Sequence, residues 1–387
     1  MASFDSASGG HSRASLIADS AGNLYGTATT NGANGFGTVF KWDVTTNTVA
    51  ALASFDETNG FFPVAGLVSD PAGNLYGTAL YGGENGDTGL GTVFKVDAAT
   101  NALSAIGSFD QATTGGFPLA SLIRDSSGVL YGTANIGGAA LGGTIFAVNP
   151  ATNSFAALTS FNGTNGGSPQ GRLLLGSGGI LYGTTTSGGA QNAGTIFRFD
   201  TATNSLVSLI SFAGPNGQYP NAGLIADAAG NLYGTTQGGG LYNKGTIFKL
   251  DAATNTLISL YSFDGTTGRL PLSDLLIDAN GNLYGTAYGG GSADDYGTVF
   301  KYDQSTNMLT DLVAFNNTDG ANPFAGLYAD ASGNLYGTTF AGGANGIGTI
   351  FKITGAGFAV PEPSTFALLA IAGFALLVVG RRRAHLA

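Results

Sequence analysis

The 387-residue chain contains no cysteine, and only 10% of its residues are charged. Without thiols it can form no disulfide, no thiolate metal site and no cysteine nucleophile. Histidine and glutamate are also scarce: before Pro361 the chain has only His11, Glu57 and Glu84. These residue types supply many of the general acids and bases of enzymes. We therefore predict a protein that is not an enzyme, with no catalytic residue, no metal and no cofactor.

Basic residues are outnumbered as well, with 14 Lys and Arg against 24 Asp and Glu. Three of the arginines lie in the last few residues, so the rest of the chain is even more acidic. An acidic surface repels nucleic acid and anionic surfaces. We expect no nucleic-acid partner.

Glycine is abundant, at 65 residues, and much of it belongs to a repeated pattern. The tetrapeptide Leu-Tyr-Gly-Thr occurs seven times, at steps of 51 to 55 residues. Such regular spacing indicates one structural unit repeated seven times. The seven tyrosines are Tyr25, Tyr76, Tyr131, Tyr182, Tyr233, Tyr284 and Tyr336.

Each unit contains four short segments rich in Val, Ile, Leu, Phe, Tyr and Thr and bounded by Gly, Asn, Asp or Pro, a pattern typical of β-strands. In the second unit these segments are 65–70, 74–80, 91–97 and 102–109. A four-stranded unit of about 50 residues matches the blade of a β-propeller. We predict an all-β fold, a seven-bladed β-propeller of four-stranded blades over residues 1–355.

Two turns repeat with the strands: Asp-x-x-Gly-Asn after the first strand and Asp-x-x-Thr-Asn after the third. Aspartate bonds the turn backbone and glycine supplies positive φ. Two copies of the first turn depart from the pattern, at 128–129 and at 176–180. Calcium could bind these turns, although one carboxylate per turn is too few for its oxygen cage. Most of the repeated basic residues have an aspartate two positions later, which predicts local ion pairs.

The seventh unit has no fourth strand of its own, because nothing after 348–352 corresponds to 257–263 of the fifth unit. The missing piece occurs at the other end of the chain, where residues 2–5 match the end of that strand in other units. A ring closed by its own N-terminal strand has no open sheet edge. We predict that residues 2–5 complete the seventh blade.

Residues 356–387 are a different kind of sequence. Pro361, Glu362 and Pro363 precede an apolar run of 15 residues at 366–380, which the three arginines 381–383 follow directly. The run is short for a transmembrane helix, which needs about 17 to 25 residues, although snorkelling arginines extend its reach. We predict one C-terminal transmembrane helix, with the arginines in the cytoplasm and the propeller on the far side of the membrane.

This tail resembles the PEP-CTERM sorting signal of Gram-negative bacteria. The resemblance implies an exosortase-like processing enzyme as partner, with Pro361, Glu362 and Pro363 as its recognition motif. It also implies that Arg381, Arg382 and Arg383 are retention charges, and that the protein occupies the inner membrane transiently before it reaches the cell surface or the exterior. A plain C-terminal anchor is the alternative reading.

An exported protein is expected to begin with a charged region and an apolar region. Residues 1–5 instead enter the first repeat directly. Either the start codon is placed too far downstream or a signal peptide was left out, and we favour the first explanation.

The repeats resemble the tandem GloVer repeats, named from Gloeobacter and Verrucomicrobia. The resemblance rests on Gly-Asn-Leu-Tyr-Gly-Thr, the following Gly-Gly, and Gly-Thr-Val/Ile-Phe-Lys, and it covers nearly all of residues 1–355. It implies surface display and supplies no catalytic residue.

Differences between the units indicate a binding face. The stretch from the Leu-Tyr-Gly-Thr glycine to the Gly-Thr-Val/Ile-Phe glycine is 11 residues in five units, 12 in the sixth and 14 in the second. Insertions on one face often mark the binding face of a repeat protein. Aromatic residues in these loops and in the connections between blades could stack on sugar rings or pack on neighbouring loops. The ligand-binding candidates are Tyr81, Tyr242, Tyr288, Phe62 and Tyr219.

The leading hypothesis is a non-enzymatic, surface-displayed propeller that binds exopolysaccharide or another matrix component. The alternatives are a propeller glycan hydrolase or lyase, and a purely structural surface protein. His11 occupies the position that Phe62 and Tyr219 fill in other units. We predict that it is an exposed loop residue and not a catalytic base.

Overall fold

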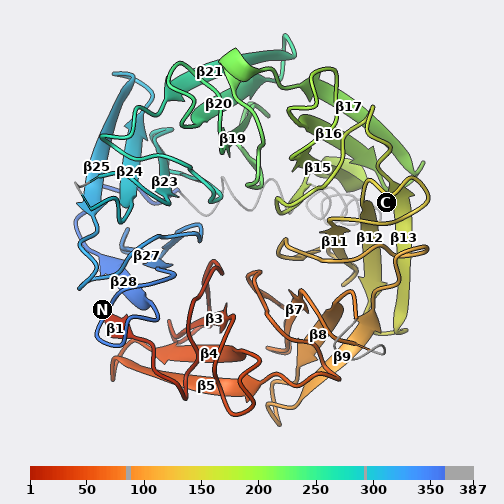
Figure 1. The fold of residues 1–387 in the computed structure, drawn as a ribbon, viewed down its shortest axis with the longest axis vertical. Helices are drawn as coiled ribbons and strands as arrows, with labels where there is room; N and C mark the ends of the chain where they lie inside the picture. The colour runs from red at the N-terminus through yellow and green to blue at the C-terminus, as the bar shows by residue number, and fades with distance from the viewer. Residues whose placement is uncertain (84–88, 292–293, 362–387) are drawn as a thin grey trace, which may run out of the picture.

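The computed structural model describes residues 1–83, 89–291 and 294–361. These residues form seven four-stranded antiparallel sheets arranged as blades around a central channel (Figure 1). The architecture confirms the predicted seven-bladed all-β propeller. In the first six blades the strand order follows the sequence from the channel to the rim, and in the seventh the outermost strand comes from the N-terminus.

The two inner strands of each blade form a hairpin. The first strand lies beside the channel: β2 (Ile17–Ala18), β6 (Val68–Ser69), β10 (Ile123–Arg124), β14 (Leu174–Leu175), β18 (Ile225–Ala226), β22 (Leu276–Ile277) and β26 (Tyr328–Ala329). The second strand carries the Leu-Tyr-Gly-Thr motif: β3 (Leu24–Ala28), β7 (Leu75–Ala79), β11 (Leu130–Ala134), β15 (Ile180–Thr185), β19 (Leu232–Thr236), β23 (Leu283–Ala287) and β27 (Leu335–Thr338).

The two outer strands form the rest of each blade. The third strand carries the Thr-Val/Ile-Phe motif: β4 (Thr38–Asp43), β8 (Thr92–Val96), β12 (Thr144–Asn149), β16 (Thr195–Asp200), β20 (Thr246–Asp251), β24 (Thr298–Asp303) and β28 (Thr349–Ile353). The fourth strand lies at the rim: β5 (Thr48–Ser54), β9 (Leu103–Ser108), β13 (Ser154–Ser160), β17 (Ser205–Ser211), β21 (Thr256–Ser262), β25 (Met308–Ala314) and β1 (Ala2–Ser3). Two short 3-10 helices, η2 (Ser177–Gly179) and η3 (Gly214–Asn216), lie in turns.

The hydrophobic core lies between blades, and the motif glycine makes room for it. A Cβ built on Gly26 would lie 2.7 Å from Cζ of Phe40, and the equivalent contact in all seven blades is 2.4 to 2.7 Å. The phenylalanine of each third strand also meets the phenylalanine at the end of the previous blade's fourth strand, with ring centroids 4.9 to 5.3 Å apart. The seven pairs are Phe4–Phe40, Phe55–Phe94, Phe109–Phe146, Phe161–Phe197, Phe212–Phe248, Phe263–Phe300 and Phe315–Phe351.

The first strand is shorter than predicted, two residues instead of 65–70 in the second blade. The residues before it run along the channel, where their backbone groups bond side chains of neighbouring blades. The Gly66 N–H donates to Ser121 Oγ at 2.8 Å, and the Ala65 carbonyl accepts from Thr27 Oγ1 at 2.8 Å. Side-chain partners therefore replace part of the strand ladder.

The threonine of the Leu-Tyr-Gly-Thr motif joins each blade to the next one. Thr27 binds the second blade in this way, and Thr338 closes the ring by donating to the Ala14 carbonyl of the first blade at 3.2 Å. Thr133 is the exception, because its buried Oγ1 has no hydrogen-bond partner among the described residues. The four other bonds are Thr78 to Ala120, Thr184 to Ala222, Thr235 to Ser273 and Thr286 to Ala325.

This exception gives a matched test of the threonine bond. We expect Thr27→Val to lower the free energy of unfolding by about 1 kcal/mol, because it removes a buried hydrogen bond between blades. The same substitution at Thr133 removes a buried hydroxyl that has no hydrogen-bond partner in the described structure, so we expect no loss or a small gain. Urea unfolding of both variants measures the difference. An equal loss in the two variants would contradict a role for this hydroxyl in joining blades.

The predicted closure of the ring by the N-terminus is confirmed. β1 pairs with β28, with Ala2 opposite Ile350. The chain continues the contact beyond the strand, because the Phe4 N–H donates to the Gly348 carbonyl at 3.1 Å. The fourth strand of the seventh blade therefore comes from the other end of the chain.

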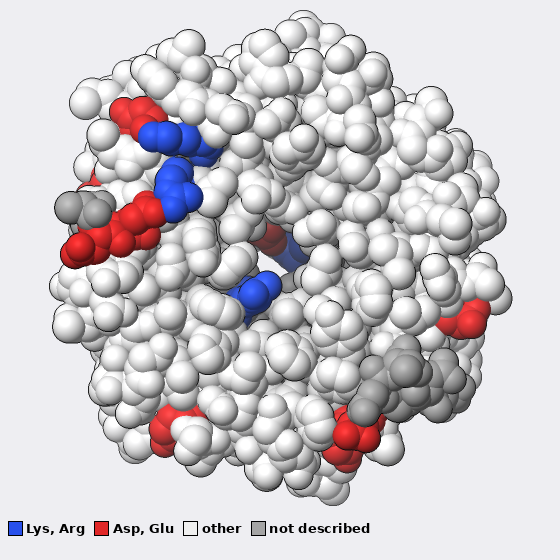
Figure 2. Space-filling model, in the orientation of Figure 1, with Lys and Arg blue, Asp and Glu red and all other residues white. Residues whose placement is uncertain are grey.

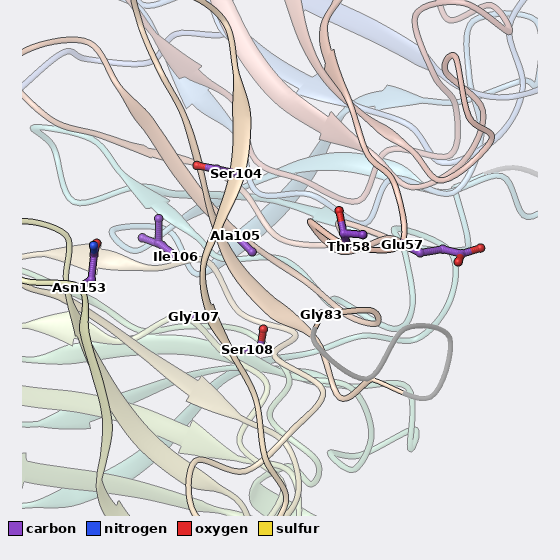
Figure 3. Close-up of a pocket in the computed structure, with 9 residues that line it drawn as sticks. All are labelled: Glu57, Thr58, Gly83, Ser104, Ala105, Ile106, Gly107, Ser108 and Asn153. Carbon is purple, nitrogen blue, oxygen red and sulfur yellow. The ribbon is translucent and has the colours of Figure 1, made fainter.

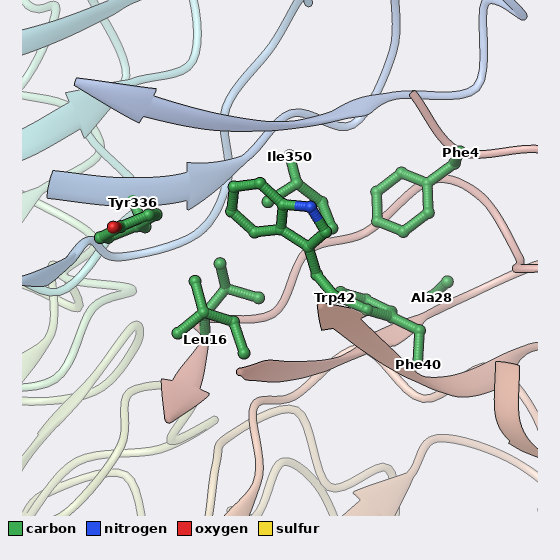
Figure 4. Packing of buried hydrophobic residues seen from close by; sticks show 8 residues of the cluster. Phe4, Leu16, Ala28, Phe40, Trp42, Tyr336 and Ile350 are labelled. Atoms are coloured by element: carbon green, nitrogen blue, oxygen red, sulfur yellow. The ribbon is translucent and has the colours of Figure 1, made fainter. Parts of the chain in front are cut away.

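The packing at this closing seam involves both the first and the seventh blade (Figure 4). Phe4 is fully buried and its ring lies 4.9 Å from that of Phe40 in the first blade. Trp42, the one tryptophan of the chain, meets Tyr336 of the seventh blade edge to face at 5.9 Å. The fluorescence of Trp42 can therefore report on the closing seam.

The Asp-x-x-Gly-Asn turns are hydrogen-bonded as predicted. Asp19 Oδ1 accepts from the N–H groups of Ala21 and Asn23, each at 2.9 Å, and Oδ2 accepts from the Tyr25 hydroxyl at 3.0 Å. Burial together with this bond to Asp19 raises the pKa of Tyr25 to about 12. The fourth blade differs, because Gly176 stands where the other blades have this aspartate.

The repeated basic residues on the third strands contact side chains of their own blade. Lys41 and Lys301 have their ammonium groups 5.9 and 5.8 Å from the ring centroids of Tyr25 and Tyr284. In three other blades the predicted ion pairs form at 3.2 to 3.6 Å: Lys95–Asp97, Arg198–Asp200 and Lys249–Asp251.

After β28 the chain crosses the face that carries the Asp-x-x-Gly-Asn turns, called the turn face below. Phe358 is buried and its ring lies 5.1 Å from that of Tyr284 in the sixth blade. The Tyr284 hydroxyl donates to the Gly357 carbonyl at 3.1 Å, and the Ala279 N–H donates to the Ala359 carbonyl at 2.8 Å. Residues 356–361, called the strap below, therefore pack against the sixth blade.

Within the described ranges, no helix has the length and apolar character needed to cross a membrane. The predicted transmembrane segment 366–380 lies outside the described residues, as do Glu362, Pro363 and the arginines 381–383.

Candidate functional site: the loop face

The loops between second and third strands and the connections between blades share one face, called the loop face below. One residue per blade, called the slot residue, joins these two kinds of segment. The Tyr219 N–H donates to the Ala193 carbonyl in the loop of the previous blade at 2.8 Å, and the Tyr219 carbonyl accepts from the Gln237 N–H in its own blade at 3.1 Å. The seven slot residues are His11, Phe62, Phe117, Ser168, Tyr219, Leu270 and Asn322.

The backbone of the slot residues repeats, but their side chains do not. Each N–H donates to the loop of the previous blade at 2.7 to 3.1 Å, and every φ lies between 52 and 59°. This left-handed conformation costs an L-residue roughly 1 to 2 kcal/mol, and glycine adopts it most readily. None of the seven is glycine, and they range from aromatic to polar. A constant backbone conformation with side chains that vary between blades is compatible with a recognition surface.

Three of the five ligand-binding candidates project into solvent. Phe62 is 38% exposed, Tyr219 44% and Tyr242 53%. Tyr81 and Tyr288 are half-buried and pack on aromatic neighbours. The structure therefore divides the candidates into exposed side chains and side chains that support the loops.

Tyr81 belongs to an aromatic cluster at the boundary of the first three blades. Its ring stacks on Phe61 at 5.3 Å and meets Phe62 and Phe117 edge to face at 6.0 and 5.5 Å. Phe61 also packs on Phe36, at 5.4 Å. Tyr81 thus fixes Phe62, the exposed slot residue of the second blade.

Tyr288 belongs to a second cluster, which the sequence interpretation missed. The Arg13 guanidinium lies over the rings of Phe324 and Phe340, 4.6 and 4.9 Å from their centroids, and Phe324 packs on Tyr288 at 4.8 Å. Arg13 and Phe324 both stand two residues after a slot residue. This shared position was the one available signal for the cluster.

His11 is half-buried, so the prediction of an exposed loop histidine is wrong. Its Nδ1 lies 2.9 Å from Thr30 Oγ1, and its ring lies 4.8 Å from that of Phe340. Burial and the nearby positive charge of Arg13 lower the pKa of His11. The neutral imidazole therefore acts as a packing and hydrogen-bonding group within the loop face.

Figure 2 shows the loop face as a mostly uncharged surface around a hollow centre. Charged side chains gather over the fifth and sixth blades, where Arg269 pairs with Asp295 beside Lys244. In the channel, Arg172 Nε of the fourth blade lies 3.1 Å from Asp274 Oδ2 of the sixth. The rest of the visible face is uncharged over wide areas and suits a neutral ligand.

A groove of about 860 Å³ lies against the rim strand β9 of the second blade (Figure 3). Its described lining residues include one charged side chain, Glu57. Glycoside hydrolysis commonly uses two carboxyl groups about 5 to 10 Å apart. The described lining of this groove does not supply such a pair.

Asp311 is the described carboxyl whose pKa is raised toward neutrality. Burial, with repulsion from Asp264, raises its pKa to about 6, and its buried Oδ1 has no hydrogen-bond partner in the described part of the chain. Asp311 lies within the rim strand β25, opposite Phe300, and not among the slot residues. In the three described ranges, no three His, Cys, Asp or Glu side chains are placed to hold a metal ion.

Two family descriptions match the chain. A Gloeobacter/Verrucomicrobia repeat matches residues 1–174, 86–294 and 271–367, and a PEP-CTERM protein-sorting motif matches residues 359–383. A search of curated proteins finds no match.

Solved propellers share the fold at low sequence identity. The extracellular domain of a proposed hybrid two-component system of B. thetaiotaomicron is 15% identical, with a TM-score of 0.57 over 90% of this chain and 40% of that chain. A GH74 enzyme of Niastella koreensis is 17% identical, with a TM-score of 0.57 over 89% and 52%. A proposed 6-phosphogluconolactonase of Bacteroides fragilis is 19% identical, with a TM-score of 0.51 over 80% and 85%. Because these proteins differ in activity, the likeness establishes the fold alone.

Proposed function

We propose that this chain, which belongs to the Gloeobacter/Verrucomicrobia repeat family, is a non-enzymatic propeller that binds exopolysaccharide or another matrix component through its loop face. Its PEP-CTERM motif marks it for sorting to the cell envelope or surface. We further propose that residues 366–380 cross the inner membrane until an exosortase-like enzyme cleaves the tail.

The ring of slot residues is the observation that carries the binding proposal. Seven positions share one strained backbone conformation and one hydrogen bond from their N–H to the loop of the previous blade, and they differ in side chain. Strained backbone is often found at functional sites, where neighbouring structure holds it in place. The buried phenylalanine of the third strand, by contrast, is the same in all seven blades.

The chemistry of the face favours a neutral glycan. Tyr219 and Tyr242 of the fifth blade offer exposed aromatic rings, which can stack on the apolar face of a sugar. Their neighbours Gln218 and Asn243 are hydrogen-bonded to each other at 3.1 Å, so the two tyrosines project from one connected strip. These amides can also bond sugar hydroxyls.

Binding by the full chain in mild detergent to an array of bacterial polysaccharides tests the proposal. For any glycan retained, Tyr219→Ala with Tyr242→Ala should weaken binding at least about ten-fold, equal to about 1.4 kcal/mol. The unfolding free energy should change by less than about 0.5 kcal/mol per site, because both side chains are exposed. Ile258→Ala with Met308→Ala, at exposed rim positions, is the control and should leave binding unchanged.

The same array separates the alternatives. Release of shortened glycan would favour a hydrolase or lyase, and absence of all binding would favour a purely structural surface protein. Equal weakening by the tyrosine pair and by the rim control would place the ligand elsewhere than on the loop face.

A further inference from the structure

A second groove, of about 810 Å³, lies on the turn face beside the channel. It extends over the fourth to seventh blades, and half-buried aliphatic side chains of the first strands form much of its lining. Covering such a surface with an apolar group is favourable, because it removes apolar area from water. Its aliphatic residues include Leu174, Leu175, Ile225, Leu276 and Ile277.

The groove lies on one side of the channel because the second residue of the first strand differs between the blades. The second residue of the first strand is Leu175 in the fourth blade and Ile277 in the sixth, but Ser69 in the second and Arg124 in the third. The turn after the first strand of the fourth blade, which departs from the repeat pattern, also makes this side of the groove less polar. Gly176 replaces the aspartate of the other blades, so this edge of the groove carries no carboxylate.

The strap leads the chain into this groove. Phe358 and Val360 belong to its lining together with Pro361, the last described residue. The apolar run 366–380 begins five residues later. Five steps of the chain span at most about 18 Å, so the run must start close to the groove.

We propose that the turn-face groove holds the chain's own apolar run, residues 366–380, whenever that run is not in a membrane. The strap supplies the run at a high effective concentration, so a weak apolar contact is enough for occupancy. Docking would shield the run from water and from other copies before it enters the membrane. This inference concerns the turn face and does not depend on the loop-face ligand.

Disulfide trapping in the full chain tests the docking, because the natural sequence has no cysteine. Ala226→Cys places a thiol in the groove, and Ala370→Cys or Ala375→Cys places the second thiol in the run. Ser69→Cys is the matched control, at the same position of the first strand in the second blade. In detergent-free buffer, the groove thiol should form at least about ten-fold more intramolecular disulfide than the control, since a disulfide needs Cα atoms about 4.4 to 6.8 Å apart.

Detergent micelles, which take up an apolar run, should remove this preference. Ala329→Cys, in the groove at the same position of the seventh blade, provides a second trap if Ala226→Cys folds poorly. Equal yields at groove and control positions would overturn the proposal, as would no disulfide from either tail position. Disulfides chiefly between two chains would overturn it as well, because the run would then occupy the groove of another copy.

Discussion

Deletion of residues 1–8 should destabilise the whole ring and shift the emission of Trp42 to longer wavelength. The deletion removes β1 from β28, so the seventh blade is left with three strands and an open edge. It also removes Phe4, which is fully buried between the seventh and first blades. Loss of a buried phenylalanine alone typically costs about 3 to 5 kcal/mol, and the open edge adds to that.

Single substitutions separate closure from ordinary core packing. Phe4→Ala and Phe161→Ala each remove one member of an equivalent pair, with ring centroids 4.9 and 5.0 Å apart. Both should lower the unfolding free energy by about 3 to 5 kcal/mol. Only Phe4→Ala should alter the emission of the folded protein, because Trp42 lies in the Phe4 cluster and Phe161 lies in another.

Urea unfolding followed by circular dichroism and by Trp42 fluorescence measures these effects. An unchanged unfolding midpoint after deletion of residues 1–8 would contradict closure by the N-terminus. Similar emission shifts in the folded Phe4→Ala and Phe161→Ala variants would show that Trp42 does not report on the seam.

The repeat spacing was sufficient to predict the ring because each blade uses the same local solutions. The motif glycine packs against a phenylalanine ring, and the motif threonine donates a hydrogen bond to a carbonyl of the next blade. The motif tyrosine donates a hydrogen bond to a turn aspartate. The start and end of the repeats predicted the closing strand for the same reason. The length of the first strand was overestimated most, because side-chain partners along the channel cannot be inferred from strand propensity.

The candidate site was less predictable because it depends on contacts between units. Sequence patterns placed Phe62 and Tyr219 in the connections between blades, but not their left-handed backbone, which neighbouring loops impose. Both residues precede a proline, Pro63 and Pro220. The residue before a proline usually adopts an extended conformation, so a left-handed one was not expected. The packing of Arg13 on Phe324 joins residues from opposite ends of the chain, and the one sequence signal for it is that both stand two residues after a slot residue.

The sorting motif begins at the end of the described chain, close to the contacts of the strap with the sixth blade. Pro361 is three residues beyond Phe358, which is buried against Tyr284. If residues 366–380 cross the inner membrane, as we propose, a short connection of this kind would keep the turn face close to the membrane. The loop face, on the opposite side of the ring, would then point away from the membrane.

Replacing Glu362 and Pro363 by alanine should leave the protein uncleaved in the inner membrane of a host that carries the processing enzyme. The parent chain should instead appear as a shorter, released form, because we propose that the processing enzyme recognises the PEP-CTERM motif. Immunoblots of membrane and medium fractions measure both length and location. The control is alanine at Ser364 and Thr365, which changes two neighbouring residues and preserves Pro361, Glu362 and Pro363. Normal cleavage and release of the Glu362 and Pro363 variant would show that the tail is a plain anchor, and the apolar run with its arginines would then account for membrane retention by itself.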